Sequence, residues 1–247
     1  MKHYIDGKII VITGGSSGFG LEAARMLLEM GARVAITGRN AERLNDAVKE
    51  LGGSENLMPI QADACLTEDW KRLIAEVTEC WGTIDVLVLN HGAGVKIANI
   101  EDMDDATIQQ VMDINIISVM KGAREVMPVM KKAGKGHIIT VSSACAYHSW
   151  AAFGVYTAAK SGLVGLTKCL HVEMSAWGGK ATMFVPGAAR TGFCDAAGLD
   201  SGWLEGFPSA EDFAHTLVQC IDVPENCFIE EARIWGTAQV PGMVNPF

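Results

Sequence analysis

Short runs of apolar, mostly β-branched residues recur along the 247-residue chain, and the segments between them repeat an apolar position every three or four residues. Such runs are typical of strands buried on both faces, whereas the longer period indicates amphipathic helices. The runs predict strands at 8–13, 33–37, 57–62, 86–90, 137–142, 181–185 and 228–235. The periodic segments predict helices at 21–31, 42–51, 69–80, 108–130 and 155–177.

Strands that alternate with helices form βαβ units, and right-handed crossovers between these units build a parallel sheet with helices on both faces. We therefore expect an α/β fold, a doubly wound (Rossmann-type) parallel β-sheet. No Pro/Ser/Gly-rich linker, charge block or internal repeat divides the sequence, so residues 1–247 are expected to form a single domain. Ligands of such sheets bind across the carboxyl ends of the strands.

The first predicted strand leads into a glycine-rich turn, Gly14-Gly-Ser-Ser-Gly18-Phe-Gly20, and then into the first predicted helix. This order is the context of a dinucleotide-binding fingerprint, in which the backbone approaches the pyrophosphate and the helix N-terminus offers free N–H groups. The spacing Gly-x-x-x-Gly-x-Gly differs from the commoner Gly-x-Gly-x-x-Gly form in its first gap. The turn predicts a dinucleotide cofactor in contact with Thr13, Gly14, Ser16, Ser17, Gly18, Phe19 and Gly20.

Arg39 follows the second predicted strand, at the place where such folds bind the adenosine ribose. An acidic residue there would accept a hydrogen bond from a free 2′-hydroxyl, whereas a planar guanidinium suits a 2′-phosphate. We therefore expect NADP(H) rather than NAD(H). A plain surface arginine is the alternative interpretation.

Tyr156 and Lys160 are four residues apart within a predicted helix, so they share one face. A tyrosine that exchanges protons near neutral pH needs its pKa lowered by roughly three units, or about 4 kcal/mol. One positive charge at ~4 Å supplies about that much at an effective dielectric constant of ~20. The pair predicts that Tyr156 donates and accepts a proton with the help of Lys160. Taken alone, the spacing also fits a partly buried tyrosine beside a solvated lysine.

Several motifs in a fixed order carry a family resemblance. They are Thr13-Gly14-x-x-x-Gly18-x-Gly20, Asn90, Asn115, Ser143 and Tyr156-x-x-x-Lys160. Together they resemble the short-chain dehydrogenase/reductase family over about residues 5 to 240. The resemblance implies an oxidoreductase that interconverts a secondary alcohol and a ketone by hydride transfer. It implies that the catalytic residues are Asn115, Ser143, Tyr156 and Lys160.

The family gives each of these positions a role. Carried over, Tyr156 exchanges the proton of the substrate oxygen, Ser143 hydrogen-bonds that oxygen, and Lys160 binds the nicotinamide ribose. Asn115 would interrupt its helix and hold a water of a proton relay. His91-Gly92-Ala93 departs from the family's usual Asn-Asn-Ala-Gly, and we expect His91 to be a structural or pocket residue. Further implied cofactor contacts are Asp63, Ala64, Asn90, Gly92, Tyr156, Lys160, Pro186, Gly187 and Thr191.

Two segments, 144–153 and 192–208, are expected to wall the substrate, with a lid at about 188–208. Both are rich in aromatic residues, which predicts an apolar pocket with few polar anchors. We expect a bulky apolar alcohol or ketone such as a hydroxysteroid. Packing of these aromatics in the core or between subunits is the alternative. The predicted substrate contacts are Ser143, Cys145, Tyr147, Trp150, Phe193 and Trp203.

Two other functions stay open. The segments 209–214 and 228–239 are similar to a branch of the family that acts on small 3-hydroxy acids and serine. Such substrates need a cation for their carboxylate, and Arg190 is the only arginine or lysine near the expected mouth. The second alternative is a catalytically silent NADP(H)-binding sensor, although such chains typically lose the tyrosine, lysine or serine that this chain retains.

Composition excludes some classes of protein. A net charge of −9 and a pI near 5.1 argue against general nucleic-acid binding. Seven scattered cysteines without a Cys-x-x-Cys pair indicate reduced thiols, and we expect no metal site. Without an apolar leader or a stretch of ~18 apolar residues, we expect a cytoplasmic protein with no membrane partner. The resemblance implies a homo-oligomer, either a dimer or a homotetramer, through the helices that carry Asn115 and Tyr156.

Overall fold

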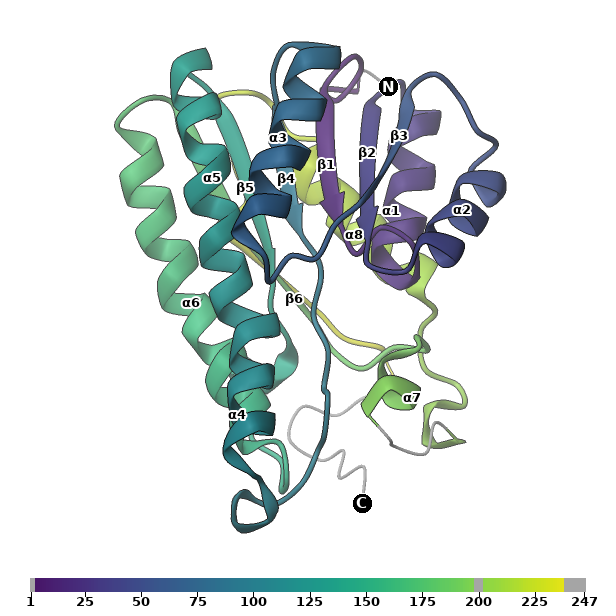
Figure 1. Cartoon of the computed structure of the whole chain (residues 1–247), viewed down its shortest axis with the longest axis vertical. Coiled ribbons are helices and arrows are strands. Elements are labelled where there is room, and N and C mark those ends of the chain that lie inside the picture. Colours follow the sequence, from purple (N-terminus) through teal and green to yellow (C-terminus); the bar gives the residue numbers. More distant parts are fainter. Residues whose placement is uncertain (1–2, 198–201, 238–247) are drawn as a thin grey trace.

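The computed structural model describes residues 3–197 and 202–237. Within these residues a parallel sheet of seven strands, in the order β3-β2-β1-β4-β5-β6-β7, forms the centre of the molecule (Figure 1). The expected doubly wound α/β fold is confirmed. The strands are β1 (Ile9–Thr13), β2 (Arg33–Gly38), β3 (Leu57–Gln61), β4 (Val86–Leu89), β5 (Gly136–Val141), β6 (Gly179–Pro186) and β7 (Glu231–Ile234).

Helices cover both faces of the sheet (Figure 1). The longer ones, α1, α3, α5, α6 and α8, pack on the strands, whereas α7 is a short helix beyond the carboxyl edge. The helices are α1 (Gly18–Glu29), α2 (Ala41–Glu50), α3 (Thr67–Trp81), α4 (Asp105–Met112), α5 (Ser118–Ala133), α6 (Gly154–Ser175), α7 (Phe193–Ala197) and α8 (Ala210–Ile221).

Alternation along the strands divides the apolar core in two, because successive side chains point to opposite faces of a sheet. Ile10 and Ile12 of β1 belong to the core shared with α1, α2 and α8. Ile9 and Val11 belong to the core shared with α3, α5 and α6. A strand that is buried on both sides needs apolar residues at every position, which explains the continuous β-branched runs in the sequence.

The position of the cleft follows from the strand order. β1 and β4 are neighbours in the sheet although β2 and β3 separate them along the chain. From this pair the chain proceeds outward in both directions, towards β3 on one side and β7 on the other. The connections beyond β1 and β4 therefore diverge and leave a crevice at the carboxyl ends of the strands.

Four elements differ from the sequence prediction, and one of them is the short helix α7, for which no helix was predicted. The helix predicted at 108–130 consists of α4, a π-helical segment at Asp113–Ile117, and α5. Helix α8 was not predicted, although Ser209 and Asp212 form a capping box at its start, which is a recognisable signal. β7 begins at Glu231 rather than at residue 228, because its pairing with β6 starts there.

No helix in the described ranges is long and apolar enough to cross a membrane. Residues 198–201, which belong to the lid expected at 188–208, and residues 238–247, which end the expected domain, lie outside the described residues.

Candidate active site

A cleft of about 1090 Å³ opens beyond the carboxyl ends of the strands. Sites for drug-sized ligands typically measure roughly 300–1,000 Å³, so this cleft has room for a dinucleotide and a second molecule. It brings together residues that are distant in the sequence. The predicted site residues that line it are Gly14, Ser16, Ser17, Gly18, Phe19, Arg39, Asp63, Ala64, Asn90, Gly92, Ser143, Cys145, Trp150, Tyr156, Lys160, Pro186, Gly187, Thr191 and Phe193.

The glycine turn is tightly packed at Gly20, where a side chain has no space. A Cβ atom on Gly20 would lie 2.6 Å from the carbonyl oxygen of Gly14 and 2.6 Å from Nδ2 of Asn90. Gly14 (φ +65°) and Gly18 (φ +56°) also adopt the left-handed backbone conformation that favours glycine. At these glycines no side chain stands between the backbone and the cleft, so the backbone can approach a phosphate closely.

Helix α1 begins at this turn and presents its N-terminus to the cleft. Ser17, at the N-cap, makes no side-chain hydrogen bond to the helix, and the first turn contains no acidic residue. The first N–H groups of a helix have no partner inside it, and the helix dipole favours a negative charge at this end. These residues therefore fit the pyrophosphate of a dinucleotide.

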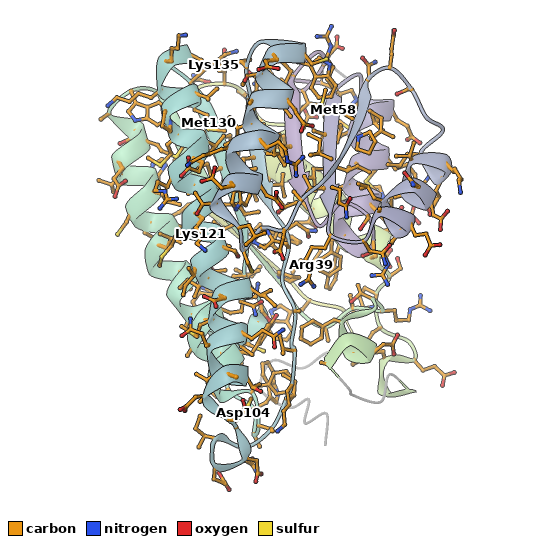
Figure 2. The ribbon with its side chains drawn as sticks, in the orientation of Figure 1. Arg39, Met58, Asp104, Lys121, Met130 and Lys135 are labelled. Carbon is orange, nitrogen blue, oxygen red and sulfur yellow. The ribbon has the colours of Figure 1, made fainter. Side chains whose placement is uncertain are left out.

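Arg39 lies beyond the end of β2 (Figure 2) and lines the cleft together with Ser16. Arg43, which the sequence analysis missed, lines the same end. The side chain of Asn40 caps helix α2 by accepting a hydrogen bond from the N–H of Arg43 at 2.8 Å. The sequence did contain a signal for Arg43. It follows, by three residues, an asparagine that is a good helix cap and comes directly after Arg39. Two guanidinium groups beside a helix N-terminus form a positive end of the cleft that suits a phosphate.

Thr13 shapes the cleft from behind, because it is buried and does not line it. Its hydroxyl donates to the carbonyl oxygen of Val88 at 3.1 Å and accepts from the N–H of Asn90 at 3.0 Å. The Nδ2 atom of Asn90 donates to the carbonyl oxygens of Thr13 (3.0 Å) and Gly14 (3.2 Å). These bonds tie the end of β1 to the end of β4 and fix the glycine turn.

His91 lines the cleft and has both ring nitrogens engaged. Nδ1 lies 2.7 Å from the hydroxyl of Thr13, and Nε2 lies 2.7 Å from the hydroxyl of Ser118. Burial lowers the pKa of His91 to about 3, and the charges of Lys160 and Arg39 act in the same direction. The ring is therefore neutral at physiological pH and holds two elements together, which fits the expected structural histidine.

Asn115 is fully buried in the π-helical segment, so the interruption of its helix is present as expected. Its Nδ2 donates to the carbonyl oxygens of Ala93 at 2.8 Å and Val111 at 2.9 Å, and its Oδ1 accepts from the N–H of Ala93 at 3.2 Å. A Cβ on Gly92 would lie 3.0 Å from this Oδ1 and 3.2 Å from Nζ of Lys160. Asn115 therefore clamps the segment after β4. Its part in a proton relay stays a prediction.

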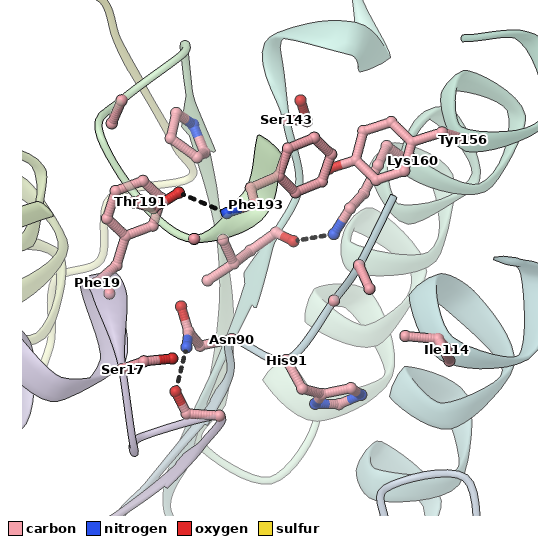
Figure 3. A pocket seen from close by; sticks show the side chains of 18 of the residues that line it. Ser17, Phe19, Asn90, His91, Ile114, Ser143, Tyr156, Lys160, Thr191 and Phe193 are labelled. Carbon is pink, nitrogen blue, oxygen red and sulfur yellow. Dashed lines mark hydrogen bonds between the residues drawn. The ribbon is translucent and has the colours of Figure 1, made fainter. Parts of the chain in front are cut away.

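Ser143, Tyr156 and Lys160 lie together in one part of the cleft (Figure 3). Tyr156 and Lys160 are one turn apart on α6, and Ser143 lies just beyond the end of β5. Nζ of Lys160 lies 5.7 Å from the centroid of the Tyr156 ring and donates to the carbonyl oxygen of Val141 at 2.9 Å. A hydroxyl, a phenol and an ammonium thus converge at one place, which allows proton donation to a bound oxygen atom.

The pKa values of the pair depart from the sequence expectation. Burial raises the pKa of Tyr156, with Cys145 acting in the same direction, and a hydrogen bond with Ser143 opposes both. Burial also lowers the pKa of Lys160 to about 8. In this structure burial therefore decides the direction of the Tyr156 pKa, and Lys160 is not among the groups that lower it.

Aromatic rings wall the other half of the cleft. Trp150, Phe153, Tyr156 and Phe193 form a chain of ring contacts with centroid distances of 6.4, 6.2 and 5.4 Å. Trp235, just after β7, lines the same half. Phe153 ends the segment 144–153 that was expected to wall the substrate, although it was not named as a contact, and Trp235 was not predicted, since nothing in a single sequence shows which aromatics of a strand end face a cleft.

Two predicted substrate residues need separate mention. Tyr147 does not line the cleft: its hydroxyl donates to Glu231 at 2.6 Å, and the guanidinium carbon of Arg233 lies 3.6 Å from its ring centroid. Because the hydroxyl is bound to the edge strand β7, this tyrosine fastens its loop to the sheet. The side chain of Trp203 lies outside the described residues.

Charge and metal ligands complete the description. Arg190, the candidate cation for an acidic substrate, is exposed and does not line the cleft. Among residues 3–197 and 202–237 no group of three His, Cys, Asp or Glu residues could hold a metal ion.

A doubly wound sheet with a phosphate-binding glycine turn and a Ser–Tyr–Lys cluster at one edge defines a class of nucleotide-dependent oxidoreductases. Comparison with known proteins identifies the family. The short chain dehydrogenase family matches residues 8–200, and the chain belongs to this short-chain dehydrogenase/reductase family.

Two relatives and two solved structures illustrate the similarity. Dehydrogenase/reductase SDR family member 4 from Sus scrofa is 30% identical over 81% of this chain and 72% of its own. Zerumbone synthase from Zingiber zerumbet is 32% identical over 76% of this chain and 70% of its own. The closed form of a serine dehydrogenase complexed with NADP+ is 25% identical, covering 96% and 98% of the chains with a TM-score of 0.88. A metagenomic short-chain oxidoreductase in complex with NADP is 26% identical, covering 95% and 99% with a TM-score of 0.81.

Proposed function

We propose that this protein is an NADP(H)-dependent oxidoreductase that interconverts a secondary alcohol and a ketone, with Tyr156 as the acid/base. The observation that carries the proposal is the convergence of Ser143, Tyr156 and Lys160 in the same cleft as the glycine turn. When bound, the cofactor supplies the hydride. The presence of all three groups together with Asn115 speaks against a catalytically silent sensor.

The roles of the residues follow from their chemistry. Tyr156 gives its proton to the oxygen of the ketone in the direction of reduction, and Ser143 hydrogen-bonds that oxygen as negative charge develops on it. In alcohol oxidation Tyr156 must accept the proton instead. Because burial raises the pKa of Tyr156, this direction requires more positive charge near the phenol than Lys160 alone provides. A nicotinamide in its oxidised form carries such a charge.

Preference for NADP(H) is supported by the two arginines at the outer end of the cleft. A 2′-phosphate between Arg39 and Arg43 would be neutralised by both, and the N-terminus of α2 adds its dipole. Two proteins with similar structures, the serine dehydrogenase and the metagenomic oxidoreductase, are in complex with NADP.

The substrate half favours a neutral, bulky alicyclic ketone or alcohol, of which a hydroxysteroid is one example. Its walls are rings and aliphatic groups. Apart from Lys160, the charged side chain that lines this half within the described residues is Asp195, and a carboxylate repels an acidic substrate.

A small 3-hydroxy acid is the second candidate substrate. It is favoured by the overall likeness to serine dehydrogenase over 96% of this chain. Against it stands the position of Arg190 outside the lining of the cleft, which leaves a substrate carboxylate without an obvious partner.

A substrate panel tests the proposal. We expect NADPH to be oxidised with cyclic and steroid ketones, with kcat/KM at least tenfold above that for serine or 3-hydroxybutyrate with NADP+, since one unpaired carboxylate costs more than ~1.4 kcal/mol. Higher kcat/KM for the acids would establish the alternative. Tight NADPH binding without any turnover would instead identify a sensor.

The cofactor preference is tested with Arg39→Ala and Arg43→Ala. Each change removes a charge-assisted hydrogen bond worth about 1.5–3 kcal/mol, so KM for NADPH should rise about 10–100-fold while KM for NADH stays constant. Lys49→Ala is the matched control, because Lys49 is an exposed cation on the same helix but away from the cleft. Equal effects on NADPH and NADH would contradict the preference.

A further inference from the structure

Gly94 lies in the segment after β4, and helix α7 packs directly against it. A Cβ atom on Gly94 would lie 2.7 Å from Cβ of Ala197 and 3.0 Å from Cζ of Phe193. The backbone of Gly94 is not in the left-handed region, in contrast to Gly14 and Gly18. Space, and not backbone conformation, therefore requires glycine at this position.

The two residues that approach Gly94 stand at the two ends of α7. Phe193 and Ala197 are four residues apart, so they share one face of the helix. The same Phe193 ring lies 5.4 Å from the ring of Tyr156 (Figure 3). Contact with Gly94 thus sets the position of the ring that lies against the proposed acid/base.

The segment that carries Gly94 is held from the side of the proposed catalytic residues. The amide of Asn115 binds both the N–H and the carbonyl oxygen of Ala93, next to Gly94. Gly92 fits closely between Asn115 and Lys160, as the distances above show. Extra volume at residue 94 must therefore be accommodated by a shift of α7, since the other side is fixed by buried hydrogen bonds.

We propose that Gly94 is a specificity-determining position. Because Gly94 has no side chain, a recess remains beside its backbone, here called the notch, and helix α7 packs into it. The inference rests on the proposed function, since it concerns the substrate half of the same cleft. When α7 packs against Gly94, the ring of Phe193 limits the space over Tyr156 and so restricts the ring of the substrate that carries the reacting oxygen. A methyl group at residue 94 displaces α7 away from Gly94. Because Phe193 moves with the helix, small ketones bind more weakly and larger ketones gain space to bind.

Four variants test the notch: Gly94→Ala, Ala197→Gly, the double variant, and Gly165→Ala. The double variant adds a methyl group at residue 94 and removes one at residue 197, so the 2.7 Å contact between these two Cβ atoms does not form. Gly165→Ala is the matched control, because a Cβ there meets nothing within 4 Å. We expect Gly94→Ala to raise KM for cyclohexanone about tenfold, or about 1.4 kcal/mol, without a change in the Kd for NADPH. The double variant should return KM to the value of Ala197→Gly.

A second measurement needs no catalysis. Cys194 lies on α7 and is 4% exposed, so its alkylation by iodoacetamide, followed by mass spectrometry of its peptide, reports the opening of α7. We expect the rate to rise about tenfold in Gly94→Ala, again equivalent to about 1.4 kcal/mol. It should stay at the wild-type value in Gly165→Ala and return to the Ala197→Gly value in the double variant.

The outcomes separate this inference from the proposed function. A Cys194 rate in Gly94→Ala equal to that of the wild type overturns the notch, and so does a double variant that is not rescued. Loss of folding in Gly94→Ala also overturns the proposed notch, because helix α7 would then not be the part that moves to make space for the methyl group. If the wild type reduces no ketone but Cys194 responds as expected, the notch stands and the proposed function fails.

Discussion

The nucleotide half and the substrate half of the cleft are held together by different interactions. Around the glycine turn, backbone atoms and buried polar side chains are linked by hydrogen bonds, as between Thr13 and Asn90. Around Tyr156 the walls are side chains from loops, the start of α6, the short helix α7 and the end of β7. The first half depends on backbone geometry, the second on the size and shape of side chains.

This difference shows how one fold can bind a constant cofactor and a variable substrate. At Gly20 in the glycine turn, the backbone of Gly14 and the buried amide of Asn90 leave no space for a side chain. Aromatic walls such as Phe193 and Trp150 can be exchanged for other apolar groups without breaking a hydrogen-bond network. We therefore expect substitutions in the nucleotide half to change the free energy of unfolding and cofactor binding, and substitutions in the substrate half to change the KM for the substrate.

Tyr156→Phe has the largest expected effect and lies at the border between the halves. It removes one hydroxyl and keeps the ring that packs against Phe153 and Phe193. Because a positioned general acid contributes about 10²–10⁴-fold, kcat should fall about 10³-fold while NADPH binding and Tm stay constant. Steady-state kinetics and calorimetry measure these quantities. Retention of more than a few per cent of kcat would remove the phenol from the mechanism.

Gly20→Ala sharpens the comparison from the nucleotide side. Its new methyl group would meet the Gly14 carbonyl and the Asn90 amide, neither of which can move freely. We expect a loss of about 1–3 kcal/mol in the free energy of unfolding, measured by urea denaturation, with weaker NADPH binding.

The control for this change is again Gly165→Ala, an alanine placed in open space on α6. It should stabilise the protein by up to about 1 kcal/mol through helix propensity alone. Gly94→Ala should lower stability less than Gly20→Ala, because α7 can move, and should differ from the control in substrate KM. If Gly20→Ala were as stable as the control, the nucleotide half would not be the rigid one.

The smallest expected effect concerns pH and Lys160. Burial lowers its pKa from 10.5 to about 8, so between these values the unfolded chain binds more protons than the folded one. Stability contributed by this group therefore rises with pH. Between pH 8 and 9 the wild type should gain ~1 kcal/mol of unfolding free energy relative to Lys160→Met.

This prediction uses the difference between two proteins because other buried groups titrate nearby. Burial raises the pKa of Cys145 to about 11, for example, and the charge of Lys160 partly opposes this rise, so the comparison is confined to pH 8–9, below the range in which this thiol changes stability. Parallel stability curves for both proteins would mean that Lys160 keeps an ordinary pKa.

Much of the nucleotide half could be predicted from the sequence, because its signals are local. Gly14, Gly18 and Gly20 follow an apolar strand and open a helix, and this order is visible within one short segment. The pair Tyr156 and Lys160 is local in the same sense, since helical periodicity alone puts both on one face. Arg43 was missed although its position three residues after a helix cap was readable.

Contacts between distant segments decided the remaining features. The sequence by itself determined that strands alternate with helices in an α/β fold and that Tyr156 and Lys160 share one face of a helix, because these patterns are read within short segments. Only the tertiary structure decided that Tyr147 binds Glu231 instead of lining the cleft, that Asn115 occupies a π-turn, and that Gly94 receives helix α7. Each of these depends on the packing of segments far apart in the chain, which no local pattern encodes.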